Sequence, residues 1–436
     1  MTITSSAAPM GGFKTQSIGT IAFAGTVGTI VEWYDFIIYG TAAALVFNKL
    51  FFPNVDPRIG TLAALGTFAV GFLARPIGGA IFGHFGDRLG RKSMLMITMV
   101  TMGLATAAIG VLPTYAQIGI WAPILLVLLR VIQGIALGGE WGGASLMVLE
   151  HAPANRRGLF GSLVQVGFPI GLVAASVVFS TVASLPDADF KSWGWRIPFL
   201  ISVLLVGIGI FVRARLPETP VFEQIKKRGQ IVRTPLLEMI LKNPRSFLIA
   251  VGLKLSEVSW VYMLTVFVVV YATTKLGLSK PLMLNAISLA ALLELVTIPL
   301  FGHLSDIYGR RALYFAGVAF TIIFAFPLFW LLNMGSPGIV ILTVVIALNL
   351  GHGLMFAPES TYFPELFGAN VRYSGASLGF QVSAAIGGGF APVIAAALAA
   401  YMGGTAGVSI MLILLALITL AATLFARETK DDPALT

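Results

Sequence analysis

Long apolar runs separated by short polar segments follow one another along almost the whole chain. Each run reaches the length of about 20 residues that an α-helix needs to cross a bilayer. In the first half, the apolar runs cover residues 18–50, 60–82, 93–112, 120–149, 159–183 and 195–212. In the second half, they cover residues 247–273, 282–301, 312–332, 339–362, 374–401 and 407–426. The pattern predicts an all-α integral membrane protein with twelve transmembrane helices.

One long polar segment divides the twelve runs into two sets of six. It contains Pro217, Pro220 and the basic triplet Lys226-Lys227-Arg228. We therefore predict an N-terminal cytoplasmic tail at 1–17, an N-terminal six-helix lobe at 18–212, a cytoplasmic linker at 213–245, a C-terminal six-helix lobe at 246–426 and a C-terminal cytoplasmic tail at 427–436.

Composition and charge agree with a membrane protein and set its orientation. Hydrophobic residues make up 57% of the 436 residues and charged residues only 11%, which is far from the balance of a soluble domain. Most of the 28 lysines and arginines fall on one side of the predicted topology, so the positive-inside rule predicts that both termini are cytoplasmic. This bias explains the net charge of +9 without a nucleic-acid partner. The first apolar run is too long for a cleaved signal peptide, so we expect the mature protein to keep it.

A polar ten-residue segment at Gly83–Lys92 connects the second and third apolar runs. Its glycines and charges predict a turn at the membrane edge, because arginine and lysine are costly to bury in lipid. The segment Gly302–Arg311 repeats its Gly, His, Asp, Gly and Arg, each displaced by 219 positions. The sequence therefore contains a repeat of about half the chain.

Further matches support two related halves. Arg156 and Gln165 reappear as Arg372 and Gln381, displaced by 216 positions, and Glu140 has a counterpart in Glu359, displaced by 219. Parallel repeats of this kind are typical of secondary transporters. We expect two pseudo-symmetric six-helix lobes.

The first apolar run carries two carboxylates, Glu32 and Asp35, three positions apart on one helical face, with Tyr39 four residues further on. Ionisable groups inside a membrane are functional candidates, because each is costly unless it is paired or hydrated. Like charges so close together in a low dielectric allow one member to hold and release a proton. The alternative is that both carboxylates only brace neighbouring helices through hydrogen bonds.

The fourth run places Arg130 and Gln133 near the membrane midplane. A guanidinium matches a carboxylate in shape and charge, so an anionic substrate is one interpretation and a permanent ion pair with Glu32 or Asp35 is the other. Gly134, Gly138, Gly139, Gly142 and Gly143 follow on the same helix and predict a close helix–helix approach. Arg75 also lies within a span and is a second candidate for anion binding.

The second half has its own intramembrane polar residues. Lys254 and Glu257 share a face of the seventh run and are candidates for an ion pair with each other. Glu294 lies near the midplane of the eighth run. His352 in the tenth can either relay protons or be merely hydrogen-bonded.

Charged residues near the cytoplasmic helix ends are candidates for gating. For Glu140, a salt bridge to a basic residue is favoured over substrate contact. Glu150 and Glu365 are expected to pair with nearby arginines as latches. The full set of gating candidates is Asp87, Arg88, Arg91, Glu140, Glu150, Arg156, Asp306, Arg310, Arg311, Glu359, Glu365 and Arg372.

The sequence also narrows the energy source. There is no cysteine, so disulfide and thiolate chemistry are excluded. Neither a phosphate-binding loop of the type GxxxxGK[ST] nor a metal-binding motif is present. We therefore expect no cofactor and no metal, with an ion gradient as the driving force.

Several motifs resemble those of the major facilitator superfamily. They are Gly83-x-x-x-Asp87-Arg88-x-Gly90-Arg91-Lys92, its copy at 302–311, and Arg130-x-x-Gln133-Gly134. More narrowly, Glu32-Trp-Tyr-Asp-Phe36, Ala74-Arg-Pro-Ile-Gly-Gly79, Gly138-Gly-Glu-Trp-Gly-Gly143, Ser192-Trp-Gly-Trp-Arg-Ile-Pro198 and Pro364-Glu-Leu-Phe367 are similar to the metabolite:proton symporter family, which includes carriers for shikimate, 2-oxoglutarate, citrate, and proline or betaine. The resemblance spans the whole chain and implies alternating access and proton symport.

Taken with the charges, the resemblance predicts a monomeric bacterial cytoplasmic-membrane symporter that imports a small organic acid such as shikimate together with protons. The substrate-binding candidates are Arg130, Arg75, Lys254, Tyr34, Tyr39 and Gln133. The proton-coupling candidates are Glu32, Asp35, Glu257, Glu294 and His352. Trp33 and Trp260 are further aromatic candidates for a ring-accepting cavity. The alternative is proton symport of a zwitterion such as proline or glycine betaine, and a non-transporting receptor on the same scaffold also remains open.

Overall fold

The structure is a computed structural model that describes residues 17–54 and 56–432. Most of the predicted N-terminal tail and the last four residues of the C-terminal tail lie outside this part of the chain. Within it, twelve helices are long and apolar enough to cross a membrane, six before and six after the linker. The prediction of a twelve-helix, all-α membrane fold is confirmed.

The helices of the first half follow the predicted runs closely. In order they are α1 (Ile18–Ala42), η1 (Ala43–Phe47), α2 (Asn48–Phe51), α3 (Pro57–Leu89), α4 (Arg91–Val111), α5 (Tyr115–Ile118), α6 (Trp121–Leu149), η2 (Ala154–Arg156), α7 (Arg157–Gln165), α8 (Gly167–Ala183), α9 (Asp187–Ser192), η3 (Gly194–Arg196) and α10 (Ile197–Ala214).

Two short helices, α11 (Pro220–Lys227) and α12 (Pro235–Lys242), lie between the halves. The second half consists of α13 (Pro244–Tyr262), η4 (Met263–Phe267), α14 (Val268–Thr274), α15 (Lys280–Tyr308), α16 (Arg310–Asn333), α17 (Pro337–Ile346), η5 (Ala347–His352), α18 (Gly353–Glu365), α19 (Arg372–Ser383), η6 (Ala384–Phe390), α20 (Ala391–Tyr401) and α21 (Ala406–Phe425). Here η1, η4, η5 and η6 are π-helical segments inside longer spans.

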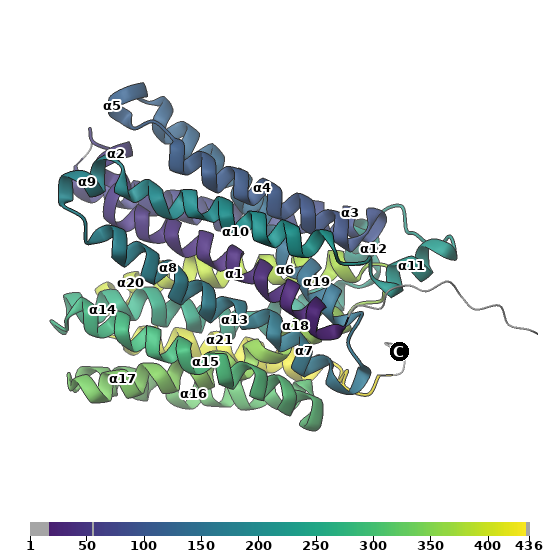
Figure 1. Ribbon diagram of the computed structural model, residues 1–436. Coiled ribbons are helices and arrows are strands. Elements are labelled where there is room, and N and C mark those ends of the chain that lie inside the picture. The colour runs from purple at the N-terminus through teal and green to yellow at the C-terminus, as the bar shows by residue number, and fades with distance from the viewer. Residues whose placement is uncertain (1–16, 55, 433–436) are drawn as a thin grey trace, which may run out of the picture.

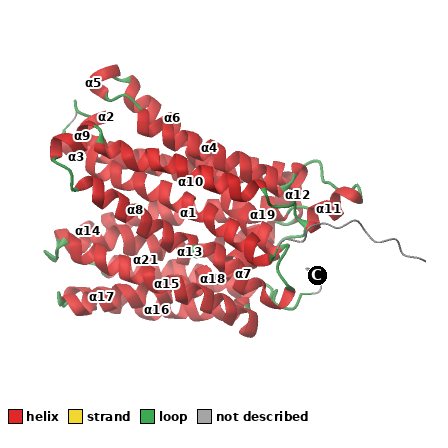
Figure 2. Ribbon diagram, in the orientation of Figure 1, coloured by secondary structure: helices red, strands yellow, loops and turns green. Residues whose placement is uncertain are grey.

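The axes of the long helices are all roughly aligned with one another (Figure 1). The short helices α11 and α12 lie together at one end of the bundle, which we call the linker end, while α5, α9 and α17 lie at the opposite end (Figure 1). Helices fill the structure and loops are confined to the two ends (Figure 2). The substrate and proton candidates inside the spans therefore lie between helices rather than on loops.

The predicted ten-residue turn at 83–92 is wrong in its extent. Helix α3 continues through Leu89, and the reversal takes place at the single residue Gly90, with φ +112°. Gly309 makes the same turn between α15 and α16, with φ +99°. This backbone conformation strains any residue with a Cβ. Asp87 lies in the last turn of α3 and Arg91 is the first residue of α4. Their side chains therefore lie on either side of the turn at Gly90, where they interact.

The linker end is also more helical than predicted. Helix α10 extends to Ala214, so Arg213 is a buried residue of that helix rather than part of the linker. Glu218 accepts hydrogen bonds from the backbone N–H groups of Arg91 and Lys92 at the start of α4 (3.1 and 3.2 Å). Glu428 does the same for Arg310 and Arg311 at the start of α16 (both 3.0 Å). A carboxylate at a helix N-terminus satisfies free N–H groups and the helix dipole.

Small residues bring α3 and α6 into close contact, as the glycine pattern predicts. A Cβ on Gly134 would lie 2.4 Å from the carbonyl oxygen of Gly71, and one on Gly138 would lie 2.2 Å from that of Arg75. Gly142, one turn further, instead faces Ser377 of α19 in the second half. The stripe thus serves packing within the first half and, at its end, contact between the halves.

Candidate functional site

A carboxylate from each half closes the linker end by binding the start of a helix in the other half. Asp87 of α3 accepts hydrogen bonds from the backbone N–H groups of Tyr373 (3.2 Å) and Ser374 (2.9 Å) of α19. The hydroxyl of Ser374 donates a third hydrogen bond to Asp87 (2.8 Å). Asp87 is buried, so these contacts replace the water that it loses.

Asp306 of α15 makes the repeat-related contact. It accepts hydrogen bonds from the backbone N–H groups of Gly158 (2.7 Å) and Leu159 (2.8 Å) at the start of α7. The two halves therefore hold each other by the same device, applied in both directions. Negative charge is stabilised at a helix N-terminus, so each contact is electrostatically favourable.

Arginines and glutamates extend these contacts. Arg91 lies 3.6 Å from Asp87 and 3.6 Å from Glu150. Arg372 of the second half approaches Glu150 to 3.5 Å. Because Glu150 contacts basic groups of both halves, it connects the halves directly.

In the second half, Arg310 binds Asp306 (2.8 Å) and Glu365 (3.4 Å). The remaining gating candidates of the two turns lie elsewhere: Arg88 and Arg156 are exposed, and Arg311 donates to the carbonyls of Thr423 (3.1 Å) and Leu424 (3.3 Å) at the end of α21. Among the described residues, these three form no hydrogen bond or ion pair between the halves.

Further inward, two glutamine amides cross between the halves. Gln165 donates to the carbonyl of Phe356 (3.0 Å), and Gln381 donates to the carbonyl of Leu137 (3.4 Å). These glutamines were matched as a repeat pair from the sequence, and the structure gives them equivalent positions. Glu140 instead forms an ion pair with Arg213 inside the first half and accepts a hydrogen bond from Thr98 (2.8 Å).

The second half contains a buried network of five ionisable residues. Lys254 donates to Glu257 (2.7 Å) and to Glu359 (2.8 Å). His352 lies between Glu257 (Nε2–Oε1, 3.0 Å) and Glu294 (Nδ1–Oε1, 2.7 Å). The network holds three carboxylates against one lysine and one histidine. Since buried charges must be balanced, it has the composition needed to hold at least one exchangeable proton.

The first half presents the opposite situation, because two of its buried arginines are not neutralised. Arg130 is fully buried and Arg75 is 3% exposed, yet neither forms an ion pair among the described residues. Both guanidiniums lie over the Phe36 ring, with Arg75 4.5 Å and Arg130 5.2 Å from its centroid. Aromatic faces offset part of the cost of burying a cation, but they do not neutralise it.

Asp35 connects to Arg130 through two neutral side chains. Arg130 donates to Gln133 (2.6 Å), Gln133 donates to Thr106 (2.8 Å), and Thr106 donates to Asp35 (2.8 Å). Gln133 is thus placed between helices as a relay and not at an open surface. This series of hydrogen bonds links Asp35 to Arg130, and no direct ion pair between the two is recorded among the described residues.

Glu32 does not pair with Asp35. It is 4% exposed, and its Oε2 atom has no hydrogen-bond partner among the described residues. Glu32 and Asp35 therefore occupy separate environments on the same helix, rather than sharing one proton between them.

A small cavity lies between the halves, near these groups. Its lining includes Arg75 from the first half and Lys254, Glu257 and His352 from the second. Its aromatic walls are formed by Trp33, Phe168, Tyr262, Phe356 and Phe380. The cavity volume is about 20 Å³, enough for about one water molecule, so an organic ligand requires the halves to separate.

Other sequence candidates lie away from this cavity. Tyr34 donates to the carbonyl of Pro198 (2.9 Å) on α10, and the Tyr39 hydroxyl lies 2.6 Å from Thr67. The Tyr39 ring faces the Arg130 guanidinium at 4.1 Å. Trp260 donates to the carbonyl of Ala347 (2.7 Å) within the second half. Phe168, Tyr262, Phe356 and Phe380 were not singled out from the sequence, where nothing distinguishes them from core aromatics.

Comparisons with known proteins agree with this architecture. A family model described as Major Facilitator Superfamily matches residues 25–390, so the chain belongs to that superfamily. It is therefore a membrane transporter and not an enzyme. The chain is 46% identical over 407 residues to the shikimate transporter of Escherichia coli strain K12, covering 92% of this chain and 93% of that protein. It is 36% identical over 423 residues to the proline/betaine transporter of Salmonella typhimurium, covering 94% and 83%.

Solved structures show the same fold. The proton:xylose symporter XylE bound to 6-bromo-6-deoxy-D-glucose matches with a TM-score of 0.74 and 19% identity, over 94% of this chain and 96% of that chain. XylE from E. coli in an inward-open conformation matches with a TM-score of 0.63 and 20% identity, over 96% and 98%. With the twelve apolar helices and the bacterial relatives, this indicates a multi-pass inner-membrane protein.

Proposed function

We propose that the chain is a proton-coupled symporter that imports a small organic acid such as shikimate by alternating access. The observation that carries this proposal is Arg75, a buried guanidinium without an ion pair, which lines the cavity between the halves opposite Lys254. A guanidinium and an ammonium on opposite walls form a site for a carboxylate. The 46% identity to a shikimate transporter supports the same substrate class.

The aromatic walls suit the rest of such a substrate. Trp33 of the first half and Tyr262 and Phe380 of the second half line the cavity. A ring-bearing acid can pack against these surfaces while its carboxylate meets the cations. Because residues from both halves would contact the same molecule, binding would draw the halves together.

Proton coupling is assigned to Glu32 and Asp35, with Glu257, Glu294 and His352 as a second set. Protonation of Glu32 leaves the positive charge of Arg75 available to the substrate carboxylate. Deprotonation restores a competing carboxylate. Competition between a protein carboxylate and a substrate carboxylate for one cation couples the two fluxes. Asp35 acts in the same sense on Arg130 through Thr106 and Gln133.

Alternating access then requires the contacts of Asp87 and Asp306 to break and reform. We assign the linker end to the cytoplasm, with both termini on that side, because the basic residues concentrate there. The gating candidates are accordingly Asp87, Arg91, Glu150, Asp306, Arg310, Glu365 and Arg372. We assign a monomer, since each chain contains both halves of the site.

A zwitterion is the second candidate substrate. The 36% identity to a proline/betaine transporter supports it, as does the presence of Glu257 beside Lys254 in the cavity wall, where a cationic group would find a carboxylate. The deciding experiment is uptake of radiolabelled shikimate into proteoliposomes with and without an inward proton gradient. Competition by 2-oxoglutarate or benzoate supports an acid, and competition only by proline or betaine supports a zwitterion. Uptake that ignores the gradient excludes proton coupling.

A further inference from the structure

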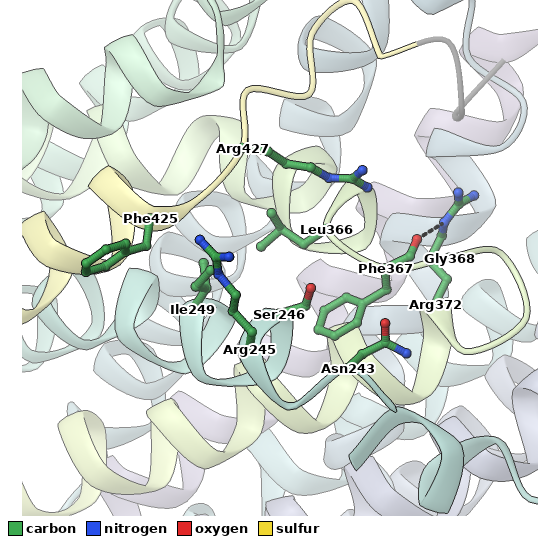
Figure 3. A pocket seen from close by; sticks show the side chains of 10 residues that line it. All are labelled: Asn243, Arg245, Ser246, Ile249, Leu366, Phe367, Gly368, Arg372, Phe425 and Arg427. Carbon is green, nitrogen blue, oxygen red and sulfur yellow. Dashed lines mark hydrogen bonds between the residues drawn. The ribbon is translucent and has the colours of Figure 1, made fainter. Parts of the chain in front are cut away.

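A second cavity lies at the linker end of the second half, next to the contact between Arg372 and Glu150 of the first half. It is formed by the start of α13, the loop between α18 and α19, and the end of α21, and its volume is about 510 Å³ (Figure 3). Cavities of this size hold small ligands. Three arginines line it, Arg245, Arg372 and Arg427, together with Asn243 and Ser246. No acidic side chain is among the described residues that line it.

The arginines are only partly neutralised. Arg427 approaches Asp432 to 3.0 Å, and Arg372 approaches Glu150 to 3.5 Å. Arg245 forms no ion pair with any residue in the part of the chain that the structure describes. Its side chain is exposed at the cavity rim (Figure 3). The cavity therefore carries net positive charge.

The start of α13 adds further hydrogen-bond donors. Asn243 precedes the helix without making a side-chain cap, so the first-turn N–H groups of Arg245 and Ser246 have no capping acceptor. Such N–H groups and the helix dipole favour an anion. The cavity thus combines guanidiniums, a hydroxyl and free backbone donors around one space.

The position of the cavity indicates how an anion reaches it. Phe425, the last residue of α21, lines the cavity and is 67% exposed, and Leu248 on the next turn of α13 is 66% exposed. Exposed apolar side chains on transmembrane helices face lipid. The cavity therefore lies where the lipid-facing surfaces of α13 and α21 meet the polar end of the bundle.

We infer that this cavity binds the phosphate of an anionic phospholipid headgroup, with the acyl chains lying along α13 and α21. Basic pockets between transmembrane helices at the membrane surface suit such headgroups. Arg372 also contacts Glu150 in the first half. A bound headgroup therefore competes with Glu150 for this guanidinium and weakens one contact between the halves.

The test is native mass spectrometry of the purified full-length protein titrated with phosphatidylglycerol and, separately, with phosphatidylcholine. We expect one phosphatidylglycerol to bind with saturation and about tenfold more tightly than phosphatidylcholine. The double variant Arg245→Gln/Arg427→Gln should weaken phosphatidylglycerol binding about tenfold or more. The matched control Arg228→Gln/Arg233→Gln removes two exposed arginines of the linker and should change binding less than about twofold.

Two further arms keep the result decisive. The single variant Arg245→Gln removes a side chain without a hydrogen bond or ion pair in the described structure, so it tests the site even if the double variant misfolds, and Arg245→Lys should retain binding. Inorganic phosphate is titrated in parallel. If phosphate displaces the lipid only at concentrations far above that of the lipid, the result supports a headgroup site. If phosphate alone binds as tightly as the lipid, the assignment to lipid is overturned. Equal losses in the linker control, or no preference for phosphatidylglycerol, would overturn the anion site.

Discussion

Arg75 and Lys254, one from each half of the chain, line the same cavity. Lys254 is held by Glu257 and Glu359, whereas Arg75 has no carboxylate partner among the described residues. The two cations are therefore not equivalent. We therefore propose Arg75 as the cation that meets the substrate, whereas Lys254 is held in the network with Glu257 and Glu359.

Removing Lys254 should strongly destabilise the protein, because this lysine is the shared partner of two buried carboxylates. Lys254→Met leaves Glu257 and Glu359 buried without their common partner, which costs about 3–5 kcal/mol. The melting temperature of the purified protein, followed by tryptophan fluorescence, measures the effect. The double variant Lys254→Met/Glu359→Gln should recover part of the loss because it removes one uncompensated charge. A double variant no more stable than Lys254→Met would contradict the proposed charge balance.

Glu32→Gln should separate exchange of substrate from its accumulation. The amide is neutral at every pH, so it no longer competes for Arg75 in a proton-dependent way. Counterflow exchange in proteoliposomes should persist, while accumulation driven by a proton gradient should be lost. Asp189→Asn, on an exposed acidic residue of α9 at the opposite end, serves as the control and should accumulate substrate normally. Normal accumulation by Glu32→Gln would remove Glu32 from the coupling mechanism.

Asp87→Ala should open the linker end more often. The variant removes the acceptor for two backbone N–H groups of α19, a helix N-terminal interaction worth up to about 2 kcal/mol. Because the chain has no cysteine, a single Ser377→Cys can report opening by its rate of maleimide labelling. Ser377 is fully buried, so labelling requires the halves to part. We expect about tenfold faster labelling in the Asp87→Ala background.

Asp306→Ala should accelerate the same labelling, since Asp306 makes the repeat-related contact with α7. The comparison is Asp432→Ala, which removes a carboxylate at the same end that pairs with Arg427 of the second half. Faster labelling in all three variants would point to general loosening. Unchanged rates in both Asp87→Ala and Asp306→Ala would exclude these aspartates from gating.

Gly90→Ala should destabilise the protein by about 1–2 kcal/mol, because a residue with a Cβ is strained at positive φ. The new Cβ would also lie 2.2 Å from Oε2 of Glu218, disturbing the N-terminal contact of α4. Gly207→Ala is the control, since a Cβ there meets no atom within 4 Å. Thermal unfolding of both variants measures the difference, and equal melting temperatures would refute the requirement for glycine at this turn.

The fold was largely predictable from the sequence, because membrane spans depend on local apolar length. Helix ends were harder: residues 83–89 contain charges and glycines that suggest a turn, yet α3 continues through them because partners in α19 satisfy Asp87. Such partners lie far away in sequence. Only the repeat, which matches Asp87 with Asp306, hinted that the two sites have equivalent roles.

Only the contacts between residues close in sequence were predictable for the site. The spacing of Lys254 and Glu257 predicted their ion pair, which the structure contains. The addition of Glu359, His352 and Glu294 to that pair requires two further spans to meet, one carrying Glu294 and one carrying His352 and Glu359, which spacing within one helix does not reveal. Arg130 and Arg75 were both candidates because each lies within a predicted span. Only the structure shows that Arg75, beside Phe36 and Phe72, lines the cavity while Arg130 faces Tyr39.

In the proposed mechanism, Arg75 binds the carboxylate of the substrate. The most direct test is equilibrium binding of radiolabelled shikimate to the purified protein, compared with Arg75→Gln and with the charge-retaining Arg75→Lys. Loss of a charge-assisted hydrogen bond of about 1.5–3 kcal/mol predicts at least tenfold weaker binding for Arg75→Gln, with a smaller loss for Arg75→Lys. Unchanged affinity in a folded Arg75→Gln variant would show that the substrate carboxylate binds elsewhere.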